Sequence, residues 1–210
     1  MEARGVTVGV AAENTWIAHR DGSDRALLID PGDEPARLQE AIEGLTVEAI
    51  LITHCHFDHI GAVAPLARAT GAPVYCPKLE VPLLEDIMRF VPWPGIGPFE
   101  SWHADHTLEG GERLELAGFD IDVIFTPGHS PGHVTYSIQD EQAMFSGDVL
   151  FQGSVGRVDL PGGDWPTLAG SIQTLLDVLP DETRVLPGHM GETTLGIERH
   201  SNPFLAELTA

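Results

Sequence analysis

Three histidines and an aspartate, residue types that bind metal ions, lie within the six positions HCHFDH, residues 54–59. They follow the apolar run VEAILIT, which is typical of a strand that is buried on both faces. Residues two apart on a strand project to the same side, so His54 and His56 can chelate one ion together. Beyond the strand end the chain turns, and Asp58 with His59 can reach a neighbouring ion. The pattern H-x-H-x-D-H after an apolar strand therefore predicts a metal site.

The residues between these ligands are expected to have a structural role. Cys55, Phe57 and Ile60 should point the other way, into the core. Cys55 is then a buried thiol rather than a nucleophile. The helix that follows is expected to begin near His59, where its N-terminal amides would stabilise the carboxylate of Asp58.

Three distant segments repeat the arrangement of a ligand at the end of an apolar strand. They are VIFTPGH, ending at His129, AMFSGD, ending at Asp148, and TRVLPGH, ending at His189. In each segment a glycine directly precedes the ligand, which lets the backbone turn sharply. If these residues merely capped strands, four independent coincidences would be required. Ligands gathered at strand ends on one edge of an α/β layer instead predict a dinuclear metal site.

The intervening elements predict a layered α/β architecture that can position these strand ends. Helices are expected at 34–44, at 59–71 and, with Asp164 as N-cap, from 164 to 180. Residues 77–110, rich in proline, glycine and tryptophan, are expected to form a surface loop with apolar anchors. Trp93, Phe99 and Trp102 either wall a substrate cleft or anchor this loop. His133, which begins a strand, is a candidate for a hydrogen bond behind the metal ligands.

Composition limits the partners. The chain of 210 residues carries 32 acidic and 11 basic side chains, a net charge of −21. Such a field repels phosphate backbones and anionic lipids, so neither nucleic acid nor a membrane is an expected partner. No signal peptide or membrane span is recognisable, and two cysteines make no disulfide framework. We expect a cytoplasmic protein acting on a small molecule; its oligomeric state stays open.

The ligand pattern resembles that of the metallo-β-lactamase superfamily over nearly the whole chain. The resemblance implies one hydrolase domain over residues 1–210, folded as a four-layer αβ/βα sandwich. It also implies two divalent metal ions, for which Zn²⁺ is expected and Fe²⁺ or Mn²⁺ are suitable. One ion would be held by His54, His56 and His129, the other by Asp58, His59 and His189, and Asp148 would bridge both.

Two divalent ions a few ångströms apart lower the pKa of a shared water toward ~7, which gives hydroxide at neutral pH. This hydroxide can attack a carbonyl while the metals stabilise the oxyanion that forms. Asp58 and Asp148 are the expected catalytic residues: both are ligands, and Asp58 can also orient the water or accept its proton. Hydrolysis is therefore the expected reaction class.

Two longer stretches, FSGDVLFQGSVGRVDLPGGD and LPGHMGETTLGIERHSNPFL, resemble the compact bacterial hydroxyacylglutathione hydrolases (glyoxalase II). The resemblance implies hydrolysis of a thioester such as S-lactoylglutathione. Full-length glyoxalase II adds a C-terminal helical domain that supplies much of the glutathione pocket, whereas this chain ends about twenty residues after His189, so the identity of the thiol stays open. Arg157 is a candidate to bind a substrate carboxylate, or else to pair with a neighbouring acid.

The alternative of a different reaction class is a persulfide dioxygenase, which the H-x-H-x-D-H motif and GRVD also resemble. That family uses one Fe(II), held by two histidines and an aspartate. Here these would be His54 or His56 with His129 and Asp148. The residues VDL after Gly156-Arg157 and PGHM around His189 differ from that family and favour the hydrolase.

Overall fold

The computed structural model describes residues 1–91 and 93–206. The chain divides into two compact units. The N-terminal unit comprises Met1–Leu108 and Glu115–Phe119, and the C-terminal unit comprises Glu109–Leu114 and Asp120–Ala210. Each unit contributes helices and strands, which agrees with the predicted α/β class. The prediction of a single domain over 1–210 stays a prediction.

The N-terminal unit contains a six-stranded sheet in the order β1-β2-β3-β4-β5-β6. The first three strands are antiparallel, and β3 to β6 run parallel. The strands are β1 (Glu2–Val8), β2 (Glu13–His19), β3 (Arg25–Ile29), β4 (Thr46–Leu51), β5 (Val74–Pro77) and β6 (His106–Leu108). The helices are α1 (Pro35–Ala41), α2 (Phe57–Ile60), α3 (Val63–Thr70), α4 (Val81–Glu85) and α5 (Ile87–Phe90), with a 3-10 turn, η1, at Lys78–Glu80.

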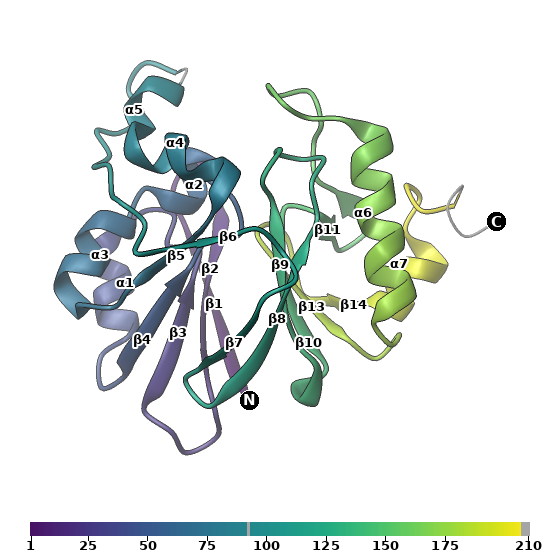
Figure 1. Cartoon of the computed structure of the whole chain (residues 1–210), viewed down its shortest axis with the longest axis horizontal. Helices are drawn as coiled ribbons and strands as arrows, with labels where there is room; N and C mark the ends of the chain where they lie inside the picture. The colour runs from purple at the N-terminus through teal and green to yellow at the C-terminus, as the bar shows by residue number, and fades with distance from the viewer. Residues whose placement is uncertain (92, 207–210) are drawn as a thin grey trace. The chain divides into compact units, whose positions relative to one another are not determined.

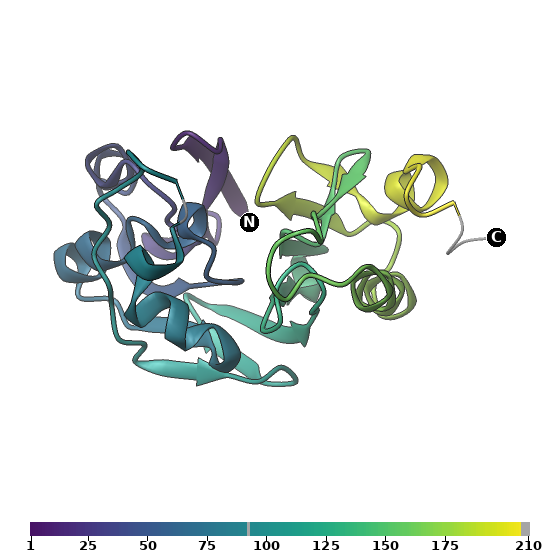
Figure 2. The same cartoon turned by 90° about the horizontal axis from the view of Figure 1, so that it is seen from above.

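Burial explains why β4 leads to the candidate ligands. Ala49, Ile50 and Leu51 are fully buried, since β4 pairs with strands on both sides and α3 packs on it. Figures 1 and 2 show α1 and α3 along one face of this sheet. Strand β4 ends at Leu51, and the candidate metal ligands of residues 54–59 follow after two intervening residues.

The C-terminal unit is built on a second six-stranded sheet, of order β14-β13-β10-β9-β8-β7, and a separate hairpin of β11 and β12. In Figures 1 and 2 its helices α6 and α7 lie on the same side of the sheet. The strands are β7 (Arg113–Leu116), β8 (Phe119–Phe125), β9 (Val134–Ile138), β10 (Ala143–Gly147), β11 (Leu150–Phe151), β12 (Ser154–Val155), β13 (Arg184–Pro187) and β14 (Thr193–Thr194). The helices are α6 (Trp165–Val178) and α7 (Leu195–Ser201), with a 3-10 turn, η2, at Gln139–Glu141.

Helix α6 begins as predicted. The Asp164 side chain accepts a hydrogen bond from the Thr167 backbone N–H at 2.9 Å, and a proline occupies the first turn. The apolar face of α6, which includes Leu168 and Ile172, is completely buried in the core of this unit. Among the described residues, no helix is long and apolar enough to cross a membrane.

Two expectations about local structure were wrong. The helix expected at 59–71 is two helices, because Gly61 and Ala62 interrupt it, and the first begins at Phe57 rather than His59. The segment 77–110, expected as a loop, contains η1, α4, α5 and β6; Pro82 lies in the first turn of α4, where its missing N–H costs nothing. Cys55 and Ile60 are buried as expected, and Phe57 is half-buried and packs against the same core.

Candidate metal site

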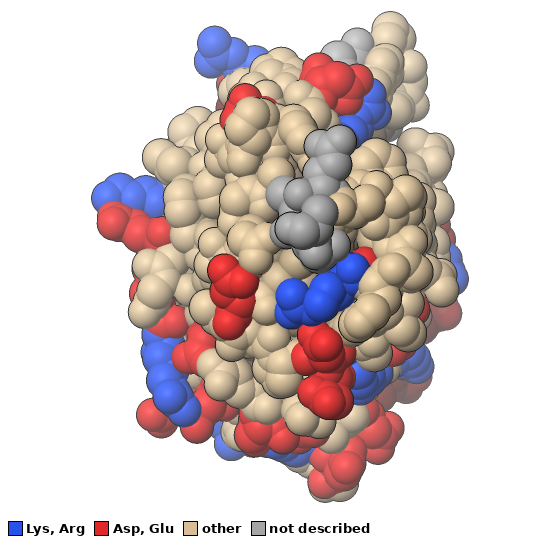
Figure 3. Space-filling model, turned by 90° about the vertical axis from the view of Figure 1, so that its right-hand side faces the viewer, with Lys and Arg blue, Asp and Glu red and all other residues tan. Residues whose placement is uncertain are grey.

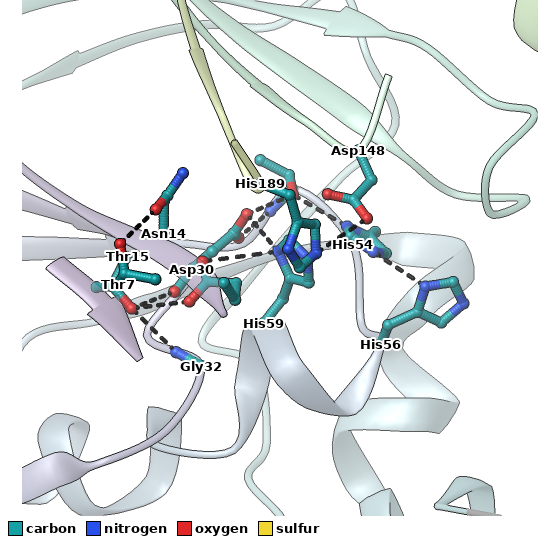
Figure 4. A network of polar contacts seen from close by, with 12 residues as sticks. Thr7, Asn14, Thr15, Asp30, Gly32, His54, His56, His59, Asp148 and His189 are labelled. Atoms are coloured by element: carbon teal, nitrogen blue, oxygen red, sulfur yellow. Dashed lines mark hydrogen bonds and ion pairs between the residues drawn. The ribbon is translucent and has the colours of Figure 1, made fainter. Parts of the chain in front are cut away.

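His54 and His56 lie in the turn after β4, and their rings meet edge to face. His54 Nε2 and His56 Nδ1 are 3.1 Å apart. Two nitrogens bound to one tetrahedral ion at about 2.0–2.1 Å would be separated by about 3.3 Å. The pair is therefore spaced as two ligands of a single ion, and Figure 4 shows the two rings facing each other.

Asp30, which directly follows β3, fixes the tautomer of His54 through Thr53. The Thr53 hydroxyl is 2.6 Å from Asp30 Oδ2 and 3.1 Å from His54 Nδ1. Because its one proton goes to the carboxylate, the hydroxyl must accept a hydrogen bond from His54 Nδ1–H. Nε2 is then the lone-pair nitrogen of His54, and this nitrogen faces His56. The Thr53 backbone N–H donates to Asp30 Oδ1 at 2.7 Å, which fixes the carboxylate in turn.

The same carboxylate orients His59. His59 Nδ1 donates to Asp30 Oδ2 at 3.0 Å, and both side chains are buried. A carboxylate behind one ring nitrogen directs the other, Nε2, toward a metal and raises its basicity. Asp30, His54 and His59 each offer a ligand atom within 4.8 Å of the others (Figure 4). Asp58 lies in the first turn of α2 with its side chain partly exposed.

A second carboxyl group, that of Glu13 on β2, lies behind this network. It is fully buried, and Oε1 is 3.9 Å from His59 Nδ1. Burial raises the pKa of Glu13 well above its usual value, and the charge of His59 only partly opposes this. Thr15 Oγ1 is 2.9 Å from the Asp30 carbonyl and 3.1 Å from Glu13 Oε2. The Thr15 hydroxyl is thus placed to donate to either oxygen, while it accepts a hydrogen bond from the Gly32 backbone N–H at 3.2 Å.

In the C-terminal unit, Asp148 lies between two imidazoles. Its Oδ2 is 3.4 Å from His129 Nε2 and 3.5 Å from His189 Nε2. Both distances match the spacing of two ligands of one tetrahedral ion. The bridging of two ions by Asp148 stays a prediction. His129 Nδ1 donates to the Arg157 carbonyl at 2.8 Å, which leaves Nε2 as the metal-binding nitrogen of His129.

Tight backbone packing holds these ligands. Gly128 has φ +127°, and a Cβ there would lie 2.2 Å from the Leu168 backbone nitrogen at the start of α6. Only glycine allows this approach, which fixes the position of His129. His133 accepts a hydrogen bond from the Asp148 backbone N–H through Nε2 at 3.0 Å. The hydrogen bond expected of His133 behind the ligands is therefore confirmed.

The other candidate residues have separate roles. Arg157 makes a bidentate ion pair with Asp159, with both distances 2.7 Å, so it has the neighbouring acid as its partner. This pair holds the pKa of Asp159 at about 2. A role of Arg157 in binding substrate stays a prediction.

The predicted ligands thus come together within each unit. His54, His56, Asp58 and His59 gather at the end of β4, whereas His129, Asp148 and His189 gather at strand ends of the second sheet. That these two groups of ligands together bind two metal ions stays a prediction. The sequence did not identify Asp30, Thr53 or Glu13. The position of Asp30 at the end of the apolar run ALLI, like that of the predicted ligands, was the one available signal for it.

Two curated bacterial proteins are similar over most of the chain. One, from Bacillus subtilis, is described as the probable metallo-hydrolase YqgX; it is 41% identical, and the match covers 98% of each chain. The other, the hydroxyacylglutathione hydrolase GloC of Haemophilus influenzae, is 38% identical over 88% of this chain and 89% of its own.

Solved structures give the same family and fold. The crystal structure of BLEG-1 B3 metallo-beta-lactamase is 40% identical with a TM-score of 0.92, covering 98% of this chain and 100% of that one. TTHA1623 in a di-iron-bound form is 46% identical with a TM-score of 0.84, covering 96% and 100%. ETHE1 from Myxococcus xanthus is 26% identical with a TM-score of 0.77, covering 97% and 84%. These matches confirm the predicted metallo-β-lactamase fold, in which two sheets are flanked by helices. Since residues 8–189 also match the family model of the metallo-beta-lactamase superfamily, the chain belongs to that superfamily.

Proposed function

We propose that this metallo-hydrolase superfamily member is a dinuclear metal-dependent hydrolase that cleaves a thioester. The observation that carries the proposal is the orientation of the imidazoles. The Nδ1 atoms of His54, His59 and His129 are hydrogen-bonded to a hydroxyl, a carboxylate and a carbonyl, respectively, and each ring therefore presents Nε2 as a ligand. A histidine that only capped a strand would need no such tautomer control.

The residues present suit the dinuclear metal centre that the superfamily binds. His54, His56 and His129 would hold one ion, and Asp58, His59 and His189 the other, with Asp148 contributing to both. When bound, such a pair lowers the pKa of a water molecule and polarises a carbonyl group. Asp58, whose carboxylate is partly exposed, would orient that water and accept its proton. Asp30 keeps His54 and His59 aligned throughout.

Similarity and charge support a small thioester as substrate. The GloC relative is described as a hydroxyacylglutathione hydrolase, so S-lactoylglutathione is the first thioester to test. The net charge of −21 opposes polyanionic partners. On the face of the molecule in Figure 3, basic side chains lie beside acidic ones. Two pairs of the C-terminal unit are of this kind, Arg199 with Asp181 at 2.9 Å and Arg184 with Glu192 at 3.0 Å.

Two other activities have specific support. The likeness to BLEG-1, a B3 metallo-beta-lactamase, favours hydrolysis of β-lactams as a second candidate. Both candidates break an acyl bond by the same attack on a carbonyl carbon. The likeness to ETHE1 keeps the persulfide dioxygenase as the alternative of another class. Iron alone would not decide for it, since TTHA1623 binds two irons.

The test combines metal analysis with three activity assays on one preparation. Thiol release from S-lactoylglutathione, cleavage of a chromogenic cephalosporin and oxygen consumption on glutathione persulfide are measured beside the metal content. We expect about two metals per chain and rapid thiol release. His54→Ala and Asp148→Ala should abolish turnover and lower the metal content. His103→Ala is the matched control, because His103 is exposed and pairs with Glu85. Full activity of either ligand variant would contradict the assigned site, and oxygen consumption without thiol release would establish the dioxygenase.

A further inference from the structure

Phe57 occupies an unusual place for a large apolar side chain. It lies between two proposed ligands, His56 and Asp58, and is only half-buried. Its ring makes a T-shaped contact with Trp93, with centroids 5.8 Å apart, and stacks on Phe99 at 6.0 Å. These distances are those of favourable aromatic pairs. The three rings, Phe57, Trp93 and Phe99, are called the aromatic cluster below.

Phe99 packs closely against the end of α2 and against α5. The Phe99 backbone N–H contacts Met88 Sδ at 3.3 Å. A Cβ on Gly61 would lie 2.7 Å from the Phe99 ring, so this glycine allows Phe99 to approach the helix that carries Asp58. The rings are therefore positioned by the same short helix as the ligands.

The outer ring of the aromatic cluster is available to a ligand. Trp93 is 48% exposed, although burial of such a side chain would be favourable. Trp102 differs, because it packs against the core of this unit and its backbone N–H donates to the Leu84 carbonyl. The aromatic residues of segment 77–110 were expected either to anchor it or to wall a substrate cleft. The packing of Trp102 fits an anchor, and the exposure of Trp93 fits the wall of a binding site.

Charge indicates an apolar group as the ligand. Two basic side chains of the surrounding elements already have partners: Arg68 pairs with Glu100 at 2.6 Å, and Arg89 lies over the Phe90 ring. An aromatic surface binds apolar and aromatic groups by burial and stacking, without requiring a counter-charge. Since Phe57 lies between His56 and Asp58 in the chain, the acyl part of a thioester whose carbonyl lies at the metal site is the group that this surface would contact.

We propose that Phe57 and Trp93 form an acyl-binding subsite that selects apolar, preferably aromatic, acyl groups. This inference rests on the proposed thioesterase function and specifies its substrate class. A phenylacetyl thioester should then be a better substrate than an acetyl thioester of the same thiol. A hydrophobic pocket discriminates between such groups by roughly 10-fold or more in kcat/KM.

The experiment compares S-phenylacetyl- and S-acetyl-N-acetylcysteamine, whose thiol is small and uncharged. For the wild type we expect kcat/KM to favour the phenylacetyl substrate by at least about tenfold. Trp93→Ala and Phe57→Leu should reduce that ratio toward one. Phe90→Ala is the matched control, since Phe90 is an aromatic residue of α5 with similar exposure, 46%, and should leave the ratio unchanged.

Binding is measured separately from turnover. Calorimetric titration of the metal-free protein with the S-phenethyl thioether of N-acetylcysteamine, which cannot be hydrolysed, should give weaker binding for Trp93→Ala than for Phe90→Ala. Equal binding by these variants, or hydrolysis of both thioesters without preference, would overturn the acyl subsite while the thioesterase function stands. Hydrolysis of neither thioester, nor of S-lactoylglutathione, would overturn the proposed function and this inference with it.

Discussion

Replacing Asp30 by asparagine tests whether the buried carboxylate controls the metal ligands. The asparagine side chain has nearly the same size, and asparagine tolerates the positive φ of 48° at this position. It would retain one oxygen but present an amide NH₂ in place of the other. The NH₂ group can only donate. In the place of Oδ2 it deprives both the Thr53 hydroxyl and His59 Nδ1–H of their acceptor, and in the place of Oδ1 it deprives the Thr53 backbone N–H.

The expected effect on metal affinity follows from that lost acceptor. If His59 moves its proton to Nε2, the nitrogen that would bind the metal carries hydrogen instead. If Thr53 turns away, the tautomer of His54 is no longer fixed. Loss of such an outer hydrogen bond lowers metal affinity by about 10–100-fold. This corresponds to about 1.4–2.8 kcal/mol of binding free energy.

The assay is a competition titration of Zn²⁺ against a chromogenic chelator, with thermal unfolding of the metal-free proteins measured in parallel. Asp33→Asn is the matched control, since the Asp33 carboxylate accepts a hydrogen bond from the Glu34 backbone N–H at 2.7 Å, away from the imidazoles. Asp30→Asn should lose affinity and Asp33→Asn should not. Wild-type affinity in Asp30→Asn would refute the argument that Asp30 fixes the ligand tautomers.

Three further predictions concern packing, charge and thiol reactivity. Gly128→Ala should lower the thermal stability and the metal content, because the added Cβ would collide with the backbone of Leu168. In Gly170→Ala, in α6, the added Cβ meets nothing within 4 Å, so this variant should raise the stability of the helix by up to about 1 kcal/mol. Thermal unfolding and metal analysis of both variants check this prediction. The low pKa of Asp159, about 2, means that its ion pair with Arg157 is present above the usual carboxyl pKa and is lost only as the pH falls through about 2. Asp159→Asn should therefore release Arg157 at neutral pH and lower the KM for S-lactoylglutathione if Arg157 binds a substrate carboxylate; an unchanged KM would exclude that role. Burial and the hydrogen bond with its neighbouring thiol raise the pKa of Cys55 well above its usual value, so iodoacetamide at pH 8 should not label it until the protein is unfolded, as peptide mass spectrometry will show.

The sequence was sufficient to predict the local ligand pattern. His54, His56, Asp58 and His59 are close in sequence, and the strand before them is marked by continuous apolar residues. The N-cap of α6 was also predictable, because Asp164 and the proline after Trp165 act on backbone groups within one turn. These features depend on contacts between near neighbours, for which residue type and spacing carry the information.

The residues that the sequence did not identify act over long separations. Asp30 hydrogen-bonds to Thr53 and His59 across 23 and 29 positions, and its neighbourhood in sequence resembles an ordinary strand end. The helices within 77–110 were not predicted, because the many prolines and glycines of this segment are typical of loops. Pro82 is nevertheless compatible with the first turn of a helix. Phe57 packs against the core as alternation predicted, but its ring contacts with Trp93 and Phe99, 36 and 42 positions away, could not be read from the sequence.

The buried carboxyl groups behind His59 also determine the charge of the N-terminal ligand group. Two ionised carboxylates in so small a volume would repel each other, and burial with the neighbouring Asp30 raises the pKa of Glu13 well above its usual value, which favours the neutral form of Glu13. Asp30 Oδ2 accepts hydrogen bonds from the Thr53 hydroxyl and from His59 Nδ1–H. His54 Nε2 and His56 Nδ1, 3.1 Å apart, are spaced as two ligands of one ion. In this unit a hydroxyl and a carboxylate therefore hold the Nδ1 atoms of His54 and His59, so that both rings present Nε2 to a metal.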